Sequence, residues 1–174
     1  MNKLSAAFLA LMISAAISSD LPAQGTLYMH VESVPGDQPR PHEGEFRLNS
    51  YAAAATNSVT VGGTGLTSGK ASFVPAKAWM KLSPASSASF HRAVATGSRL
   101  PFIEVRFYNS SGQMYYKTVY EDVFISGVST EAAADDVVQQ LEFIGTRIKW
   151  FASPDASRAP TQAGCWDVAA NRSC

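Results

Sequence analysis

The sequence has no excess of charge of either sign and no cluster of basic residues. Its 14 lysine and arginine residues balance 14 aspartate and glutamate residues, so the formal net charge is zero at pH 7. A neutral surface lacks the long-range field that attracts nucleic acid or anionic lipid. We therefore expect no nucleic-acid partner and no binding to a membrane surface by charge.

A hydrophobic run long enough to cross a bilayer is also missing. The apolar segment at residues 4–17 has 14 residues, whereas a membrane-spanning helix needs about 20. Lys3 precedes this segment and a short polar stretch ending at Ala23 follows it, which is the layout of a secretory signal peptide. We predict a signal peptide at residues 1–23 and a secreted or periplasmic protein, free of the membrane after cleavage. The alternatives are an uncleaved anchor and a start codon assigned too far upstream.

Histidine and cysteine are too few and too scattered to predict a metal site. The three histidines are His30, His42 and His91. They do not follow a metal-binding spacing such as HxxxH, and neither cysteine lies near them in the sequence. We predict no metal ion in this protein.

The glycine-rich segment at residues 62–69 precedes Lys70 and must be compared with a phosphate-binding loop. The pattern GxxxxGK[ST] needs a glycine six positions before the lysine, and Thr64 stands there instead. Ala71 follows the lysine where serine or threonine is required. The sequence therefore predicts no nucleotide and no other cofactor.

Catalytic motifs are missing as well. No GxSxG motif, which places a nucleophilic serine on a sharp turn, occurs in the chain. Glu43 and Glu45 could share a strand face, and a glycoside hydrolase needs such a carboxylate pair around its substrate. No pattern places a second carboxylate opposite them. We predict that the protein is not an enzyme, and a hydrolase using Glu43 or Glu45 is the weaker alternative.

The chain does contain a succession of short β-strand patterns. Apolar and polar residues alternate at residues 26–34 and 102–108, and apolar residues dominate a closing strand region at 137–151. Turn signals separate these patterns at frequent intervals. Together they predict a mainly β fold, which is a compact antiparallel β-barrel or two-sheet sandwich with one short α-helix.

The predicted helix occupies residues 83–97. Ser83 is a favoured N-cap, and Pro84 suits the first helical position because the N–H that it lacks would have no partner there. Gly97 is a natural end because glycine accepts the left-handed conformation that follows many helices. The helix therefore has a start and a stop that are both visible in the sequence.

The connecting segments are predicted from their composition. Residues 62–69 are glycine-rich and are expected to form a flexible loop. Residues 115–120 and 123–128 are expected to be separate strands, and residues 130–136 a polar loop. In the closing strand the apolar set changes phase after Phe143, which predicts a bulge near Gly145 or a strand buried on both faces.

The tail, residues 154–174, is rich in alanine, serine and proline, and we expect it to be flexible. Both cysteines, Cys165 and Cys174, lie in it. In an oxidising compartment such a pair tends to form a disulfide, which here would close a short local loop. The alternative is a pair of free thiols.

Several blocks follow one another in a distinctive order. They are the glycine–lysine strand at 69–73, the serine–proline helix at 83–97, the segment Val-Phe-Ile-Ser at 123–126, and the closing strand with Trp150. This order resembles the Hcp family, the haemolysin-coregulated tube proteins of the bacterial type VI secretion system. The likeness covers roughly residues 26–152 and makes residues 24–153 an Hcp-like β-barrel domain.

The resemblance implies a structural protein that assembles. Six copies would form a ring with a wide channel, and rings would stack into a tube that carries effector proteins in its lumen. A contractile sheath and a spike protein would be further partners. The chain differs from the family pattern in its predicted signal peptide, in its cysteine-bearing tail, and at residues 49–55, where relatives carry a tryptophan-rich segment.

The predicted subunit interface involves one strand and one loop. Glu104 and Arg106 lie on the outer face of the strand at 102–108 and are expected at or near the contact. The loop contributes three glycines to the same predicted interface: Gly62, Gly63 and Gly65. The alternative function is an exported monomeric binding module for a peptide or a carbohydrate, with Tyr108, Tyr115, Tyr116 and Tyr120 as its binding face.

Overall fold

The structure is a computed structural model that describes residues 25–62, 65–133, 136–155 and 158–174. The predicted signal peptide at residues 1–23 lies outside the described residues. The elements in chain order are β1 (Thr26–Val31), β2 (Phe46–Ala52), β3 (Ala55–Gly62), β4 (Gly65–Phe73), β5 (Ala76–Lys81), α1 (Pro84–Thr96), β6 (Arg99–Tyr108), β7 (Met114–Ala133), β8 (Asp136–Ala152), β9 (Thr161–Asp167) and β10 (Arg172–Ser173).

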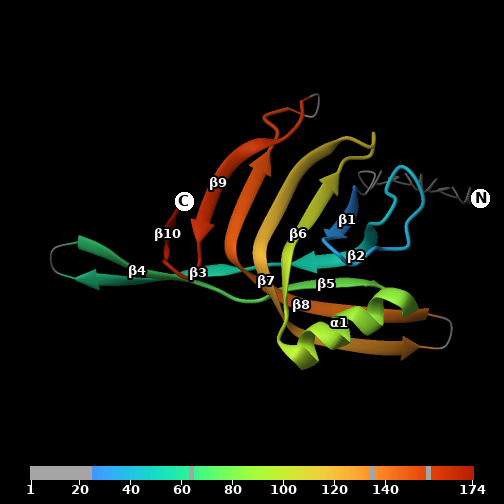
Figure 1. Cartoon of the computed structure of the whole chain (residues 1–174). Coiled ribbons are helices and arrows are strands. Elements are labelled where there is room, and N and C mark those ends of the chain that lie inside the picture. The colour runs from blue at the N-terminus through green and yellow to red at the C-terminus, as the bar shows by residue number, and fades with distance from the viewer. Residues whose placement is uncertain (1–24, 63–64, 134–135, 156–157) are drawn as a thin grey trace, which may run out of the picture.

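Six strands close into an antiparallel barrel. Among the described residues, hydrogen-bonded neighbours follow the order β8–β5–β2–β1–β6–β7, and β7 also pairs with β8, which closes the circle. β9 and β10 continue the sheet beyond β8, while β3 and β4 form a sheet of their own (Figure 1). The predicted mainly β fold is confirmed, in its barrel form.

Apolar side chains that alternate along the strands fill the barrel. The largest fully buried side chains include Phe46, Phe143, Met29, Met80, Ile103, Ile125 and Leu141. The outward positions between them carry polar and charged residues, so each strand buries one face. This is the alternation that made β1 and β6 recognisable in the sequence.

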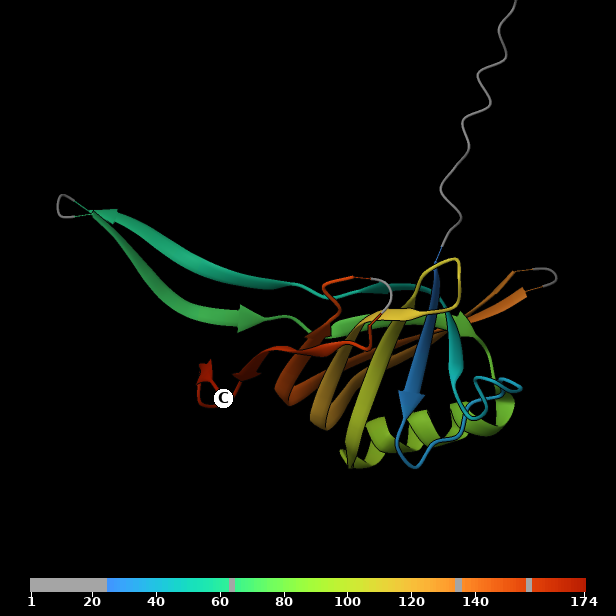
Figure 2. The ribbon, with the colours of Figure 1, turned by 90° about the horizontal axis from the view of Figure 1, so that it is seen from above.

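The helix α1 lies along one side of the barrel and packs beside β7 (Figure 2). Phe90 is fully buried, and its ring centroid lies 5.6 Å from that of Phe46 on β2. Ser83 is the N-cap residue, and Gly97 ends the helix in the left-handed region with φ of 65°. The predicted helix and both of its ends are confirmed.

The long β7–β8 hairpin corrects two predictions. Residues 115–120 and 123–128 belong to one strand, which passes through Asp122 with φ of 50°. The predicted loop at 130–136 is wrong, because β7 and β8 remain paired out to Ala133 and Asp136. Pairing there uses backbone groups alone, so it leaves no apolar alternation to detect.

The phase change in β8 falls close to its predicted place. Buried side chains occupy odd positions up to Phe143, and the next buried apolar side chain after Gly145 is Ile148. The partner strand is irregular in this region, with Asp122 at positive φ and a register shift between Ile125 and Gly127. The bulge therefore lies in β7 between Ile125 and Gly127, across the ladder from Phe143 and Glu142, while Gly145 pairs with Val123.

The tail is the largest correction. Residues 161–167 form β9, which pairs with β8 from Arg147 to Ala152, and β10 then pairs with β9. Cys165 and Cys174 are joined by a disulfide, with their Cα atoms 5.3 Å apart. The small and polar composition of this segment suits an edge strand, since such a strand needs backbone partners more than a buried face.

Candidate functional site

The β3–β4 hairpin is the most exposed element of the molecule. It pairs from Ala55 opposite Phe73 out to Gly62 opposite Gly65, and it extends away from the barrel in both views (Figures 1 and 2). The prediction of a flexible loop at 62–69 is therefore wrong for the described part of this segment. A two-stranded hairpin is marginally stable alone in water, and its free edges invite pairing with another chain.

The predicted interface glycines fall at the far end of this hairpin. Gly62 and Gly65 face each other as its last described pair, and Gly63 lies outside the described residues. Glycine also permits close strand approach further in, where a Cβ on Gly69 would lie 3.2 Å from the carbonyl oxygen of Ser58. The hairpin thus has glycine at the predicted interface positions Gly62 and Gly65, and their role in a subunit contact stays a prediction.

The base of the hairpin rests on an aromatic cluster that the sequence did not reveal. The ring of Phe73, the last residue of β4, lies 6.5 Å from Trp150 on β8 and 6.5 Å from Trp166 on β9. Gly164 approaches the Trp150 ring, since a Cβ there would lie 3.3 Å from Cε3. These aromatics are far apart in the chain, so no local pattern links them.

The two charged residues predicted at the interface belong to an ion-pair network. Arg106 Nε donates to Glu104 Oε2 at 2.8 Å, and Lys117 Nζ donates to Glu104 Oε1 at 3.1 Å. Arg106 also forms an ion pair with the buried Glu45. Oε2 of Glu45 lies 2.8 Å from His42 Nδ1, at hydrogen-bonding distance. The network ties β6 and β7 to the loop before β2.

The electrostatics of Glu104 follow from these partners. Burial alone would raise the pKa of its carboxyl, but the hydrogen bond and charge of Arg106, and then those of Lys117, lower that pKa below its ordinary value. The side chain of Glu104 is 13% exposed. Glu104 and Arg106 are thus paired within one chain, and their place at a subunit contact remains a prediction.

A shallow groove of about 530 Å³ runs over the outer face of β6, β7 and β8 beside this network. Its lining combines the apolar Phe102, Val119 and Phe151 with charged residues. Lys117 Nζ lies 4.7 Å from the centre of the Phe151 ring, in cation–π geometry. The aromatic rings of this face are of the kind enriched in protein interfaces, whereas its lysine and carboxylate side chains are of the kind depleted there.

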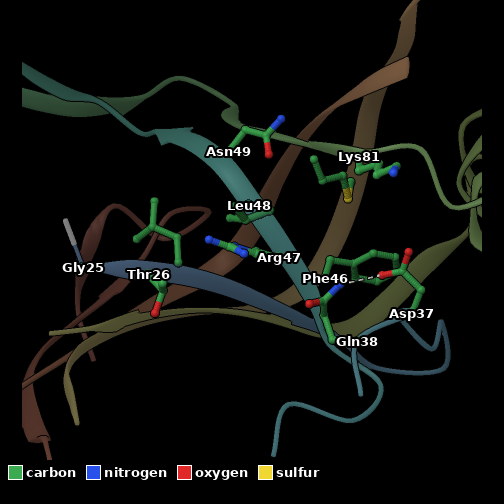
Figure 3. A pocket seen from close by; sticks show the side chains of 11 residues that line it. Gly25, Thr26, Asp37, Gln38, Phe46, Arg47, Leu48, Asn49 and Lys81 are labelled. Atoms are coloured by element: carbon green, nitrogen blue, oxygen red, sulfur yellow. Dashed lines mark hydrogen bonds between the residues drawn. The ribbon is translucent and has the colours of Figure 1, made fainter. Parts of the chain in front are cut away.

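A second, polar pocket of about 470 Å³ opens between the ends of β1, β2 and β5 (Figure 3). Arg47 and Lys81 line it together with Asp37, whose carboxylate accepts a hydrogen bond from the Gln38 amide at 3.1 Å. Asp37 is the one carboxylate among the lining residues. The pocket therefore does not contain the carboxylate pair that a glycosidase would need.

The carboxylates of the hydrolase alternative do not converge. Glu43 is exposed and pairs with Arg40 at 2.9 Å, whereas Glu45 is buried against Arg106 and His42. Over the described part of the chain, no group of three histidine, cysteine, aspartate or glutamate side chains is placed to hold a metal ion. Within the same residues, no helix is both long and apolar enough to span a bilayer.

The predicted tyrosine face is divided in the structure. Tyr120 is buried and shares a hydrogen bond with Tyr51, while Tyr115 is 43% exposed. Tyr115 and Tyr116 pack edge-on against Phe107. The structure therefore uses these rings chiefly for cross-strand packing and leaves no continuous tyrosine platform.

The closed barrel, with a separate two-stranded hairpin beside it, defines the class, a mainly β barrel protein. The family model for the type VI secretion system effector Hcp matches residues 28–151, and the chain belongs to the Hcp family. The β9–β10 extension lies beyond the matched residues. No curated protein sequence matches the chain.

Solved structures share the fold at low sequence identity. Hcp1 from Salmonella typhimurium is 16% identical, with a TM-score of 0.73 over 87% of this chain and 99% of that chain. Hcp1 from the E. coli EAEC 042 pathovar is 19% identical, with a TM-score of 0.64 over 80% and 96%. A type VI secretion system effector from Yersinia pestis is 13% identical, with a TM-score of 0.64 over 82% and 99%.

Proposed function

We propose that this chain is a ring-forming structural subunit of a type VI secretion tube, released from the cell through that system. The observation that carries the proposal is the β3–β4 hairpin, which makes a sheet of its own outside the barrel. A hairpin of this kind gains most from a second chain, because its own barrel leaves both of its edges free. Membership of the Hcp family supports the same function.

A closed ring is proposed over a two-fold dimer because the resemblance to Hcp tube proteins implies rings. If the hairpin of each copy binds a different surface of the next copy, the contact is head-to-tail, and such contacts close into rings when the rotation between copies allows it. We propose a homo-hexamer, with the groove beside Glu104 and Arg106 at or near the lateral contact. The channel would hold effector proteins, and a sheath and a spike protein would complete the assembly.

Light scattering behind size exclusion, on protein produced from the full chain and purified under oxidising conditions, tests the proposal. The expected mass is six times that of the monomer, with ring-shaped particles in electron micrographs. Replacing residues 56–72 by a short turn should leave a folded monomer, because the barrel does not depend on this separate sheet.

Two results would overturn the proposal. One is a wild-type monomer at concentrations well above micromolar, which would favour the exported binding module instead. The other is an unchanged ring after removal of the hairpin. Mass spectrometry of the same sample gives the first residue of the mature chain and so tests cleavage after Ala23.

A further inference from the structure

The C-terminal extension, β9 and β10, folds back on itself at the edge of the barrel, and we call residues 161–174 the hook. β9 pairs with β8, and β10 turns back on β9 with Arg172 opposite Asp167 and Ser173 opposite Trp166. The Cys165–Cys174 disulfide closes this turn, and the Cys174 amide N–H donates to the Cys165 carbonyl at 3.4 Å. Two residue pairs alone make a weak ladder, so the disulfide carries most of the restraint on β10.

The hook reaches the base of the hairpin through one side chain. Trp166 stands opposite Ile148 on β8, beside the Trp150–Gly164 pair, and its ring lies at 39° to that of Phe73 with centroids 6.5 Å apart. Trp150 meets the same ring at 26° and at the same distance. Phe73 therefore contacts one ring from the barrel and one from the hook, at distances typical of aromatic pairs.

We propose that the disulfide-closed hook, acting through Trp166, positions the β3–β4 hairpin for assembly, so that the oxidised chain forms the ring at a lower concentration than the reduced chain. This inference rests on the proposed function, because it makes the hairpin the assembling element. Trp166 is a positioning residue in this scheme and acts through its contact with Phe73 in the same chain. The hook lies outside the residues that match the family, so the device belongs to this chain.

The length of the hairpin explains why a small contact at its base affects the position of its far end. The hairpin leaves the barrel at Val74, whose N–H donates to the Ala54 carbonyl at 3.2 Å, and it runs from there to Gly62 and Gly65 at its far end. A change of direction at this base is multiplied along the whole length of the hairpin. Losing one of the two rings that hold Phe73 would widen the range of directions and lower the fraction of chains that are ready to assemble.

The chemistry of the switch is ordinary thiol–disulfide exchange. A dithiol reductant transfers two electrons and two protons to the Cys165–Cys174 bond, gives two thiols, and is itself oxidised to a disulfide. Cys174 is exposed and Cys165 is partly exposed, so a thiol reagent reaches the bond. Because disulfides persist in oxidising compartments, the restraint on β10 would act on the chain once it is in such a compartment.

The test compares assembly of four proteins produced from the full chain: wild type oxidised, wild type treated with dithiothreitol, Trp166→Ala, and Trp166→Phe. Reduction and Trp166→Ala should each raise the concentration for half-assembly by about tenfold, as loss of an aromatic anchor does. Trp166→Phe keeps a ring against Phe73. It replaces the indole by the smaller phenyl ring and removes an N–H that has no hydrogen-bond partner among the described residues, so it should stay within about twofold of wild type.

A second measurement separates positioning from general destabilisation. Hydrogen exchange on the dissociated chains should become faster at the base of β4 in Trp166→Ala, while amides of β1 and β6 keep their protection. Equal assembly of all four samples overturns the inference and leaves the ring proposal intact. If the oxidised wild type is a monomer, the proposed function is wrong, and this inference, which rests on it, is wrong too.

Discussion

The hydroxyl groups of Tyr51 and Tyr120 form a hydrogen bond inside the barrel. Tyr51 lies on β2 and Tyr120 on β7, strands that do not pair with each other in the described ladder. The bond therefore links two walls of the barrel through its interior. Tyr120 also packs edge-on against Phe143, with ring centroids 5.1 Å apart, so the polar link lies within an apolar core.

Stability should fall at alkaline pH because of this pair. Burial raises the pKa of Tyr120 from 10.0 to about 12, and burial together with the neighbouring Tyr120 raises the pKa of Tyr51 as well. A raised pKa in the folded state stabilises the protein below the unfolded value, and that contribution is lost as the pH rises through the folded value. We expect the free energy of urea unfolding to decline between about pH 10 and pH 12.

The double variant Tyr51→Phe/Tyr120→Phe removes both ionisable groups and both hydroxyls. Its free energy of unfolding should be lower than that of wild type near neutral pH. That free energy should decline little further in the alkaline range. The exposed Tyr115→Phe is the matched control and should keep the wild-type profile. Identical alkaline profiles for wild type and the double variant would contradict this interpretation.

Local patterns explain which parts of the fold could be predicted. β1, β6 and α1 were found because burial of one face imposes a period on the sequence and because Ser83, Pro84 and Gly97 mark the helix ends. The strand at 69–73 was predicted, but the continuation of β4 towards Gly65 and the whole of β9 were missed because neither has a strong buried stripe. Their pairing depends on backbone groups, and glycine, serine and alanine in these segments imitate the composition of loops.

The candidate site was predictable only in part. The outward direction of Glu104 and Arg106 follows from strand alternation, whereas their connection to Glu45 depends on how the loop before β2 folds back. The contact of Phe73 with Trp166 joins the strand predicted at 69–73 to a segment that was predicted to be a flexible tail. Since the tail was misassigned, its contact with Phe73 was beyond inference from one sequence.

Charge exchange in the Glu104–Arg106 pair separates its internal role from its predicted role at the interface. Glu104→Arg places a third cation beside Arg106 and Lys117. We expect it to lower the free energy of unfolding by about 1–3 kcal/mol and to prevent ring assembly. The swapped pair Glu104→Arg/Arg106→Glu restores an ion pair within the chain. We expect the swap to recover most of the stability but not the assembly, because the charges presented outward are reversed.

Urea unfolding and light scattering on the same samples provide both measurements. Arg92→Glu, a charge reversal on the exposed face of α1, is the control and should assemble normally. A swapped pair that assembles as well as wild type would remove Glu104 and Arg106 from the interface.

Acid should weaken the same network. The pKa of Glu104 is lowered in the folded chain because Arg106 and Lys117 outweigh the effect of burial. A lowered carboxyl pKa contributes stability above the ordinary value of 4.5, and this contribution is lost as the pH falls through the folded value. We expect Glu104→Gln to be less stable than wild type near neutral pH and to approach it below about pH 4. A difference between the two proteins that stays constant with pH would contradict the assignment.

Reduction of the disulfide should loosen the hook before it loosens the barrel. The closed loop is short, with a sequence separation of 9 between the cysteines, so the chain-entropy estimate is about 2.5 kcal/mol. We expect hydrogen exchange to accelerate in β9 and β10 on reduction, while the barrel strands remain protected. The variant Cys165→Ser/Cys174→Ser should behave like the reduced protein and should no longer respond to dithiothreitol. Uniform loss of protection across the barrel would show that the hook supports the whole fold.

Gly164 offers a test of the hook that leaves the disulfide intact. A Cβ at this position would lie 3.3 Å from Cε3 and 3.9 Å from Cζ3 of Trp150, so a valine must push β9 away from β8. That shift carries Trp166 away from Phe73 while Cys165 and Cys174 remain bonded. We expect Gly164→Val to weaken ring assembly about tenfold, as Trp166→Ala does, and to abolish the effect of reduction. The neighbouring Ala163→Val adds the same kind of side chain at an exposed position and should assemble normally. If Gly164→Val assembles like Ala163→Val although its β9 amides exchange faster, the hairpin takes its direction from Trp150 alone.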